Sequence, residues 1–179
     1  MPESPRIDVI DFFGKTTFET MHELIKNVNN AIAEKSSKII IRINSIGGDL
    51  APAFGAYHYL RYSNVAITAY NIGNVESAAM LLYLSADIRI AAPTSRFLIH
   101  PLSLTSPNGL TTIKTITEAA KSLEFDIGRY AEIFKHRTKN ENQTLDILKC
   151  LESDSFIVGA SEALSLGITT ETRGLWLKA

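Results

Sequence analysis

Short apolar runs alternate with helical stretches along most of this chain, and that alternation restricts the fold class. The runs are IDVIDFF (7–13), KIIIRI (38–43), VAITAY (65–70), DIRIAA (87–92) and RFLIH (96–100). Their β-branched and apolar composition is typical of strands. A run without alternating polar residues is typical of a strand that is buried on both faces. Strands that alternate with helices predict an α/β protein with a mostly parallel sheet.

Helical periodicity occupies the intervals between these runs. The expected helices span 17–35, 50–62, 76–85, 110–137, 142–151 and 160–166. The helix at 110–137 is the longest, and its apolar stripe includes Ile113, Ile127 and Phe134. A domain of this size cannot cover so much apolar helix by itself, so we expect this helix to protrude and to pack against another subunit.

Composition favours a single folded domain over residues 1–179 and excludes several functional classes. Apolar residues make up 45% and charged residues 21% of the 179 residues, and 18 Lys and Arg oppose 19 Asp and Glu. This balance predicts no nucleic-acid partner. The single cysteine, Cys150, predicts neither an internal disulfide nor a Cys-rich metal site. No apolar run reaches the roughly 20 residues of a membrane span, so no membrane contact is expected.

The N-terminal stretch MPESPRIDVIDFF predicts a cytoplasmic protein. It carries Pro, Glu and Asp where a signal peptide has basic residues followed by a long apolar run.

Two turns that follow strand-like runs are candidates for a functional site. Gly47-Gly48-Asp49 follows the second run, and paired glycines let a backbone approach a ligand closely. Ser77 follows the turn Gly73-Asn74 at the predicted start of a helix, where backbone N–H groups are free. Each feature alone is typical of an ordinary turn or a helix cap.

His100 is the third candidate, because it ends the run RFLIH and is followed by Pro101. A histidine at a strand end can reach a neighbouring turn and act as a base. Together, Ser77 and His100 have the residue types of a nucleophile and its base, which are recognised by geometry rather than by chain order.

These residues, with their flanking segments, resemble the Clp peptidase family of serine peptidases. The matching segments are IIIRINSIGGD (39–49), ITAYNIGNVESAAMLLYLSAD (67–87), APTSRFLIHPL (92–102) and ESDSFIVGASEALSLGI (152–168). The resemblance implies a Clp/crotonase-like spiral of repeated β-β-α units with a protruding handle helix, the helix at 110–137. It also implies a serine endopeptidase that cleaves peptides or unfolded proteins inside a ring or double ring of identical subunits.

The resemblance assigns a role to each site residue. Ser77 is the nucleophile, His100 the general base and Asp154 the acid that orients the histidine. Backbone N–H groups of Gly48 and Ala78 form the oxyanion hole, and no metal or organic cofactor is implied. One extra residue follows Asp154, so an ungapped comparison puts Ser155 in the place of the acid, and Glu152 is the other nearby carboxylate.

The sequence also departs from the family pattern. Ile46 replaces a proline in the glycine turn, and Glu76 puts a carboxylate beside the nucleophile. Only about six residues precede the first strand, whereas family members carry a longer segment that helps to dock an ATPase ring. An AAA+ unfoldase partner is therefore not the expectation here.

Three other interpretations stay open. Lys114 or Lys121 could serve Ser77 in a Ser-Lys dyad. A crotonase-like acyl-CoA enzyme would share the fold and would use Glu76 as its acid or base. A catalytically silent assembly protein would keep only the ring-forming fold.

Overall fold

The central sheet is parallel apart from one pairing. The computed structural model describes residues 5–103, 112–138 and 145–172. Its strands are β1 (Ile7–Phe13), β2 (Lys38–Ser45), β3 (Ala66–Glu76), β4 (Ile88–Ala91), β5 (Arg96–Ile99), β6 (Phe156–Gly159) and β7 (Glu171–Thr172). The order is β1-β2-β3-β4-β7, and β5 pairs with both β3 and β6. Among the described strands, only β5 and β6 pair antiparallel. The expected α/β class with mostly parallel pairing is confirmed.

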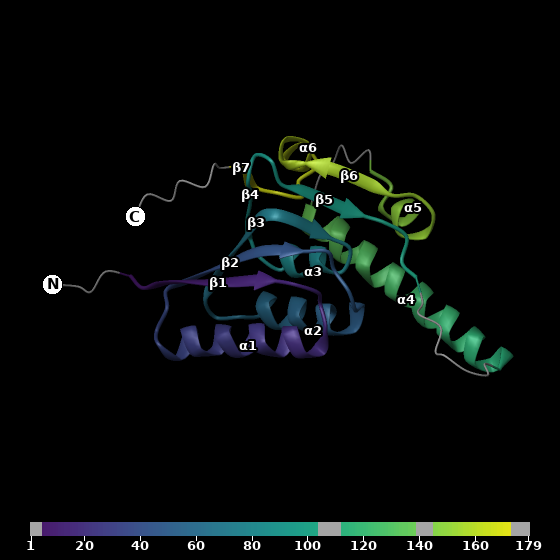
Figure 1. Ribbon diagram of the computed structural model, residues 1–179, viewed down its shortest axis with the longest axis horizontal. Coiled ribbons are helices and arrows are strands. Elements are labelled where there is room, and N and C mark those ends of the chain that lie inside the picture. The colour runs from purple at the N-terminus through teal and green to yellow at the C-terminus, as the bar shows by residue number, and fades with distance from the viewer. Residues whose placement is uncertain (1–4, 104–111, 139–144, 173–179) are drawn as a thin grey trace.

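Helices connect these strands; the first three lie beneath β1 to β3, and the last lies beside β5 and β6 (Figure 1). They are α1 (Phe18–Ala33), α2 (Leu50–Arg61), α3 (Ala79–Leu84), α4 (Ile113–Thr138), α5 (Ile147–Glu152) and α6 (Ala160–Ser165). Thr17 caps α1 reciprocally with Thr20, which satisfies amide groups at the helix start. Every residue of α3 is fully buried, so this short helix forms the centre of the core.

The end of β3 differs from the sequence prediction in a way that shapes the site. We expected the strand to end at Tyr70 and a helix to begin at Glu76, but β3 continues to Glu76 and α3 begins only at Ala79. Asparagine side chains stabilise this extension. Asn44 Oδ1 accepts a hydrogen bond from the Asn74 amide, and the Asn71 side chain donates to the Arg96 carbonyl. The strand therefore carries the chain directly to Ser77.

The long helix α4 is buried only near its C-terminal end. Tyr130, Ala131 and Phe134 are buried there, whereas the N-terminal half extends away from the sheet (Figure 1). Ile113 is 85% exposed and Phe125 is 72% exposed. The predicted protruding helix is confirmed from Ile113 to Thr138, and the first residues of its predicted span lie outside the described residues. None of the described helices combines the length and the hydropathy that a membrane span requires.

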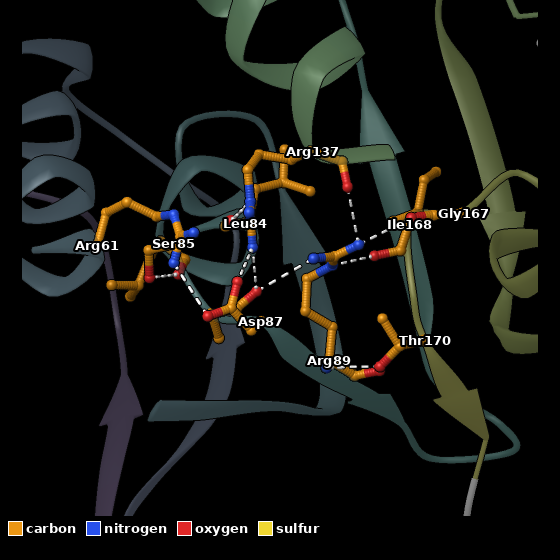
Figure 2. A network of polar contacts seen from close by, with 11 residues as sticks. Arg61, Leu84, Ser85, Asp87, Arg89, Arg137, Gly167, Ile168 and Thr170 are labelled. Carbon is orange, nitrogen blue, oxygen red and sulfur yellow. Dashed lines mark hydrogen bonds and ion pairs between the residues drawn. The ribbon is translucent and has the colours of Figure 1, made fainter. Parts of the chain in front are cut away.

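A buried arginine joins the C-terminal elements to the core (Figure 2). Arg89 on β4 donates to the carbonyl oxygens of Ile168, Gly167, Ala86 and Arg137 at 2.7 to 3.1 Å. Burial lowers the pKa of its guanidinium to about 10, so the group is still a cation at neutral pH. Arg137 donates in turn to Asp87, which also pairs with Arg61. These contacts hold the ends of α3, α4 and α6 together.

Replacing Arg89 should destabilise the fold strongly. Arg89→Met leaves several buried carbonyl oxygens without a donor, and each lost partner costs roughly 1–3 kcal/mol, so we expect a loss of at least about 3 kcal/mol. The free energy of unfolding is measured by urea denaturation. Arg61→Met, which removes a more exposed arginine that pairs with Asp87, is the control and should lose less than about 1 kcal/mol. Equal losses in the two variants would contradict this role for Arg89.

Candidate active site

Ser77 occupies a strained turn between β3 and α3. Its φ angle is 52°, in the left-handed region that non-glycine residues seldom adopt. Holding such a conformation costs roughly 1–3 kcal/mol and needs support from neighbouring groups. The Ser77 amide donates to the Leu98 carbonyl on β5 at 2.8 Å, which fixes the turn to the adjacent strand.

A buried tyrosine holds the other side of the same turn. The Tyr130 hydroxyl, on α4, donates to the Ser77 carbonyl at 3.0 Å, and the Met80 amide donates to that carbonyl as well. Complete burial raises the pKa of the Tyr130 phenol, so the hydroxyl remains a protonated donor at neutral pH. The buried C-terminal part of α4 thus positions Ser77.

The paired glycines let a second turn approach Ser77 closely. Gly47 and Gly48 have φ angles of 84° and 147°. A Cβ atom on Gly47 would lie 2.6 Å from the Glu76 carbonyl oxygen and 2.8 Å from the Ser77 Cβ. Within the described part of the chain, the amides of Gly48 and Ala78 donate to no protein acceptor. Both predicted oxyanion donors are therefore free.

His100 follows the end of β5, the strand beside Ser77. Because Glu76 on β3 pairs in register with Leu98 on β5, Ser77 and His100 emerge at neighbouring strand ends. The His100 Nδ1 lies 2.9 Å from the Pro101 carbonyl oxygen, which can only accept, so Nδ1 carries the proton. In the neutral imidazole this tautomer has its free lone pair on Nε2, the atom that can accept a proton.

Ser77 and His100 line one cavity of about 600 Å³. The glycine turn forms part of its wall, together with the start of α2 and residues Leu102 and Ser103. Three charged side chains also line it: Lys15, Asp49 and Asp126. The structure thus joins the predicted nucleophile, base and oxyanion donor Gly48 around a single space.

Asp154, the predicted acid, lies in the segment that leads into β6, and its carboxylate contacts Lys149. Ile99 pairs with Phe156 across β5 and β6, so the segment before β6 runs beside His100. The Asp154 carboxylate is 52% exposed and lies 2.8 Å from the Lys149 ammonium, which lowers the pKa of Asp154. Glu152, the other nearby carboxylate, is exposed at the end of α5. His100 therefore has a carbonyl, and not a carboxylate, on Nδ1.

Glu76, the carboxylate next to the nucleophile, is neutralised by an arginine. Its side chain is 8% exposed, and Oε1 accepts from Arg96 Nη2 at 2.6 Å and from Nε at 3.1 Å. It does not line the cavity that holds Ser77. Lys114 is 83% exposed and pairs with Glu118 on the protruding part of α4, away from the cavity wall.

Sequence reasoning missed three residues of this site. Tyr130 falls at the spacing of the apolar stripe of the long helix, and nothing in the sequence indicates that its hydroxyl contacts Ser77. Asp126 lies one helical turn before Tyr130, and that spacing was the available signal that it shares the same helix face. Lys15 follows the first strand, and nothing in the sequence linked it to the other turns.

No cluster of three or more His, Cys, Asp or Glu side chains suited to a metal ion occurs in the part of the chain that the structure describes. The cavity presents the Ser77 hydroxyl, the His100 imidazole and the Gly48 turn.

The fold and the arrangement of turns are those of the Clp/crotonase-like α/β proteins. A mutant of ClpP1 from Listeria monocytogenes superposes with a TM-score of 0.79 at 22% identity, over 94% of this chain and 92% of that one. The model of the Clp protease family matches residues 8–172. The chain belongs to the Clp protease family.

Two named relatives illustrate the sequence similarity. ATP-dependent Clp protease proteolytic subunit 2 of Borreliella burgdorferi is 31% identical over 93 residues, which is 45% of this chain and 47%, about half, of that relative. The ATP-dependent Clp protease proteolytic subunit of Chlorella vulgaris is 22% identical over 187 residues, with 96% of this chain and 90% of that protein covered.

Adding one methyl group to the glycine turn should disrupt the site. Gly47→Ala would force a Cβ atom against the backbone beside Ser77 at a φ angle that alanine disfavours. We expect the free energy of unfolding to fall by roughly 2 kcal/mol or more.

Gly55→Ala is the matched control. Gly55 is helical in α2 and has open space around its Cβ position, so alanine there should be neutral or should stabilise the protein by up to about 1 kcal/mol. Urea denaturation measures both variants. Equal effects of the two substitutions would contradict the close approach of the glycine turn to the Ser77 turn.

Proposed function

We propose that this protein is a serine endopeptidase of the Clp proteolytic-subunit type, acting on peptides or unfolded proteins. The observation that carries this proposal is the strained Ser77 turn, which lies at the strand end next to that of His100 and shares a cavity with it. Membership of the Clp protease family supports the same reaction class.

The proposed reaction follows from the protonation states of the two side chains. His100 Nε2 accepts the proton of Ser77 as the hydroxyl oxygen attacks the substrate carbonyl carbon. The negative charge that develops on the carbonyl oxygen is stabilised by the amides of Gly48 and Ala78. His100 then gives its proton to the leaving amine, and water releases the acyl group from Ser77 by the reverse sequence.

We propose that Asp154 acts as the third member of this triad once it leaves Lys149. Both side chains of that ion pair are more than half exposed, so the pair is weak and exchanges readily with solvent. A carboxylate on His100 Nδ1 would stabilise the imidazolium that forms during the reaction, which the Pro101 carbonyl does less well. Lys149 then competes with His100 for the same acid.

We further propose a ring or double ring of identical subunits that encloses the active sites. Ile113, Ile116 and Phe125 are 58% to 85% exposed on the protruding part of α4. A second copy of the chain would remove this apolar surface from water. Access to an enclosed chamber would limit substrates to short or unstructured chains.

The acyl-CoA alternative has less support. It needs Glu76 as an acid or base at the cavity, yet Glu76 is paired with Arg96 and does not line that space. A Ser-Lys dyad through Lys114 likewise finds no support in the position of that lysine.

Removing the nucleophile should abolish hydrolysis without affecting assembly. Ser77→Ala is expected to lower kcat on an unstructured, internally quenched peptide by a factor on the order of 10⁶. Light scattering of the wild-type protein and the variant should give one common mass, several times that of a single chain. Turnover by the variant above a tenth of the wild-type rate would sink the assignment of Ser77.

The acid is tested by a set of three variants. Asp154→Asn should lower kcat by roughly 10⁴, by analogy with amidation of a triad aspartate, and Glu152→Gln is the control without effect. Lys149→Gln should raise kcat, by at most about fivefold, because an exposed ion pair is weak and competes little with His100. If none of the three changes kcat, His100 works through the Pro101 carbonyl alone. If only Glu152→Gln lowers kcat, that residue is the acid.

A further inference from the structure

One wall of the cavity beside Ser77 carries a carboxylate with no role in the reaction proposed above. Asp126, on α4, lies one helical turn before Tyr130, whose hydroxyl holds the Ser77 carbonyl. Residues four apart lie on the same helix face. The helix that positions Ser77 through Tyr130 therefore also brings Asp126 toward Ser77. Asp126 and Ser77 line the same space.

The hydrogen bonds of Asp126 leave half of its carboxylate available. Arg129 Nε donates to Oδ1 at 3.0 Å, and Arg129 Nη2 forms an ion pair with the same oxygen at 2.7 Å. Among the described residues, no donor contacts Oδ2. The Asp126 side chain is 20% exposed, so Oδ2 is shielded from bulk water, in which a charge would interact weakly.

Arg129 is held on the far side of Asp126. Its guanidinium carbon lies 3.6 Å from the centre of the Phe54 ring, a cation–π contact with α2. Arg129 does not line the cavity, whereas Asp126 does. An occupant of the cavity would therefore meet the carboxylate and not the arginine that pairs with it.

The other charged side chains of the cavity wall do not cancel the negative charge of Asp126. Lys15 and Asp49 are both exposed on its wall and carry opposite charges. His100 is the proposed base, so it carries no charge in the form that accepts the proton of Ser77. Among the described residues that line the cavity, Asp126 is therefore the carboxylate whose negative charge no other lining side chain balances.

We infer that Asp126 selects substrates with an arginine or lysine at the residue whose carbonyl carbon Ser77 attacks. This inference rests on the proposed peptidase function and names its substrate class. A basic side chain in the cavity would donate a charge-assisted hydrogen bond to Oδ2, and bonds of this kind are about twice as strong as neutral ones.

The test uses three peptides that differ only at that residue, which is arginine, leucine or glutamate. Binding to Ser77→Ala is measured by fluorescence anisotropy, so that recognition is read without hydrolysis, and kcat/KM is measured with the wild-type protein. The arginine peptide should bind about tenfold more tightly than the leucine peptide, and the glutamate peptide should bind most weakly.

Three substitutions, each made in the Ser77→Ala background for binding, assign the preference to Asp126. Asp126→Asn keeps the shape of the side chain and should reduce the preference for arginine to about twofold or less. Glu132→Gln removes the same charge from α4 outside this cavity and should leave the preference intact. Arg129→Met, which frees Oδ1 as well, should increase it and covers the case in which Asp126→Asn fails to fold.

The outcomes separate this inference from the proposed function. Equal binding of the arginine and leucine peptides, or a preference that persists in Asp126→Asn or falls in Arg129→Met, overturns the role of Asp126. Asp126-dependent binding of arginine without any Ser77-dependent hydrolysis supports the recognition site and overturns the peptidase.

Discussion

The left-handed backbone of Ser77 is the constraint on which the site depends. A serine does not keep that conformation unaided, and three separate elements hold it here: the Leu98 carbonyl on β5, the Tyr130 hydroxyl on α4 and the glycine turn after β2. Each contact also fixes a part of the proposed machinery. β5 leads to His100, the glycine turn supplies the Gly48 amide, and α4 brings Asp126 to the cavity wall.

The long helix α4 therefore combines two tasks in one element. Its buried C-terminal part packs on α3 and stabilises the nucleophile turn through Tyr130. Its exposed part presents Ile113, Ile116 and Phe125, apolar side chains that a subunit interface would cover. The two parts belong to one continuous helix. A subunit contact that moved the exposed part would therefore also shift Tyr130, and with it Ser77. This physical link connects the proposed ring to the proposed catalysis.

The sequence was sufficient for features that depend on local pattern, and insufficient for those that depend on tertiary contacts. Apolar runs predicted β1, β2 and β4. A helix-start position singled out Ser77 and a strand-end position singled out His100, and the two residues line one cavity. The extension of β3 was missed because it depends on hydrogen bonds with neighbouring strands: Asn44 on β2 accepts from the Asn74 amide, and Asn71 donates to the Arg96 carbonyl on β5. The short strand β6 was missed because its pairing with β5 defines it. Tertiary packing also determines the contact between Asp154 and Lys149 and the place of Asp126 on the cavity wall. Residue spacing in the sequence does not predict such contacts.

The central claim is that the strained turn makes Ser77 a nucleophile and that His100 is its base. The most direct measurement is the intact mass of the protein after reaction with a fluorophosphonate, followed by peptide mapping. The account predicts one phosphonyl group per chain, attached to Ser77, and a loss of this labelling in His100→Ala. A chain that stays unmodified, or that carries the group on a different serine, would contradict the account.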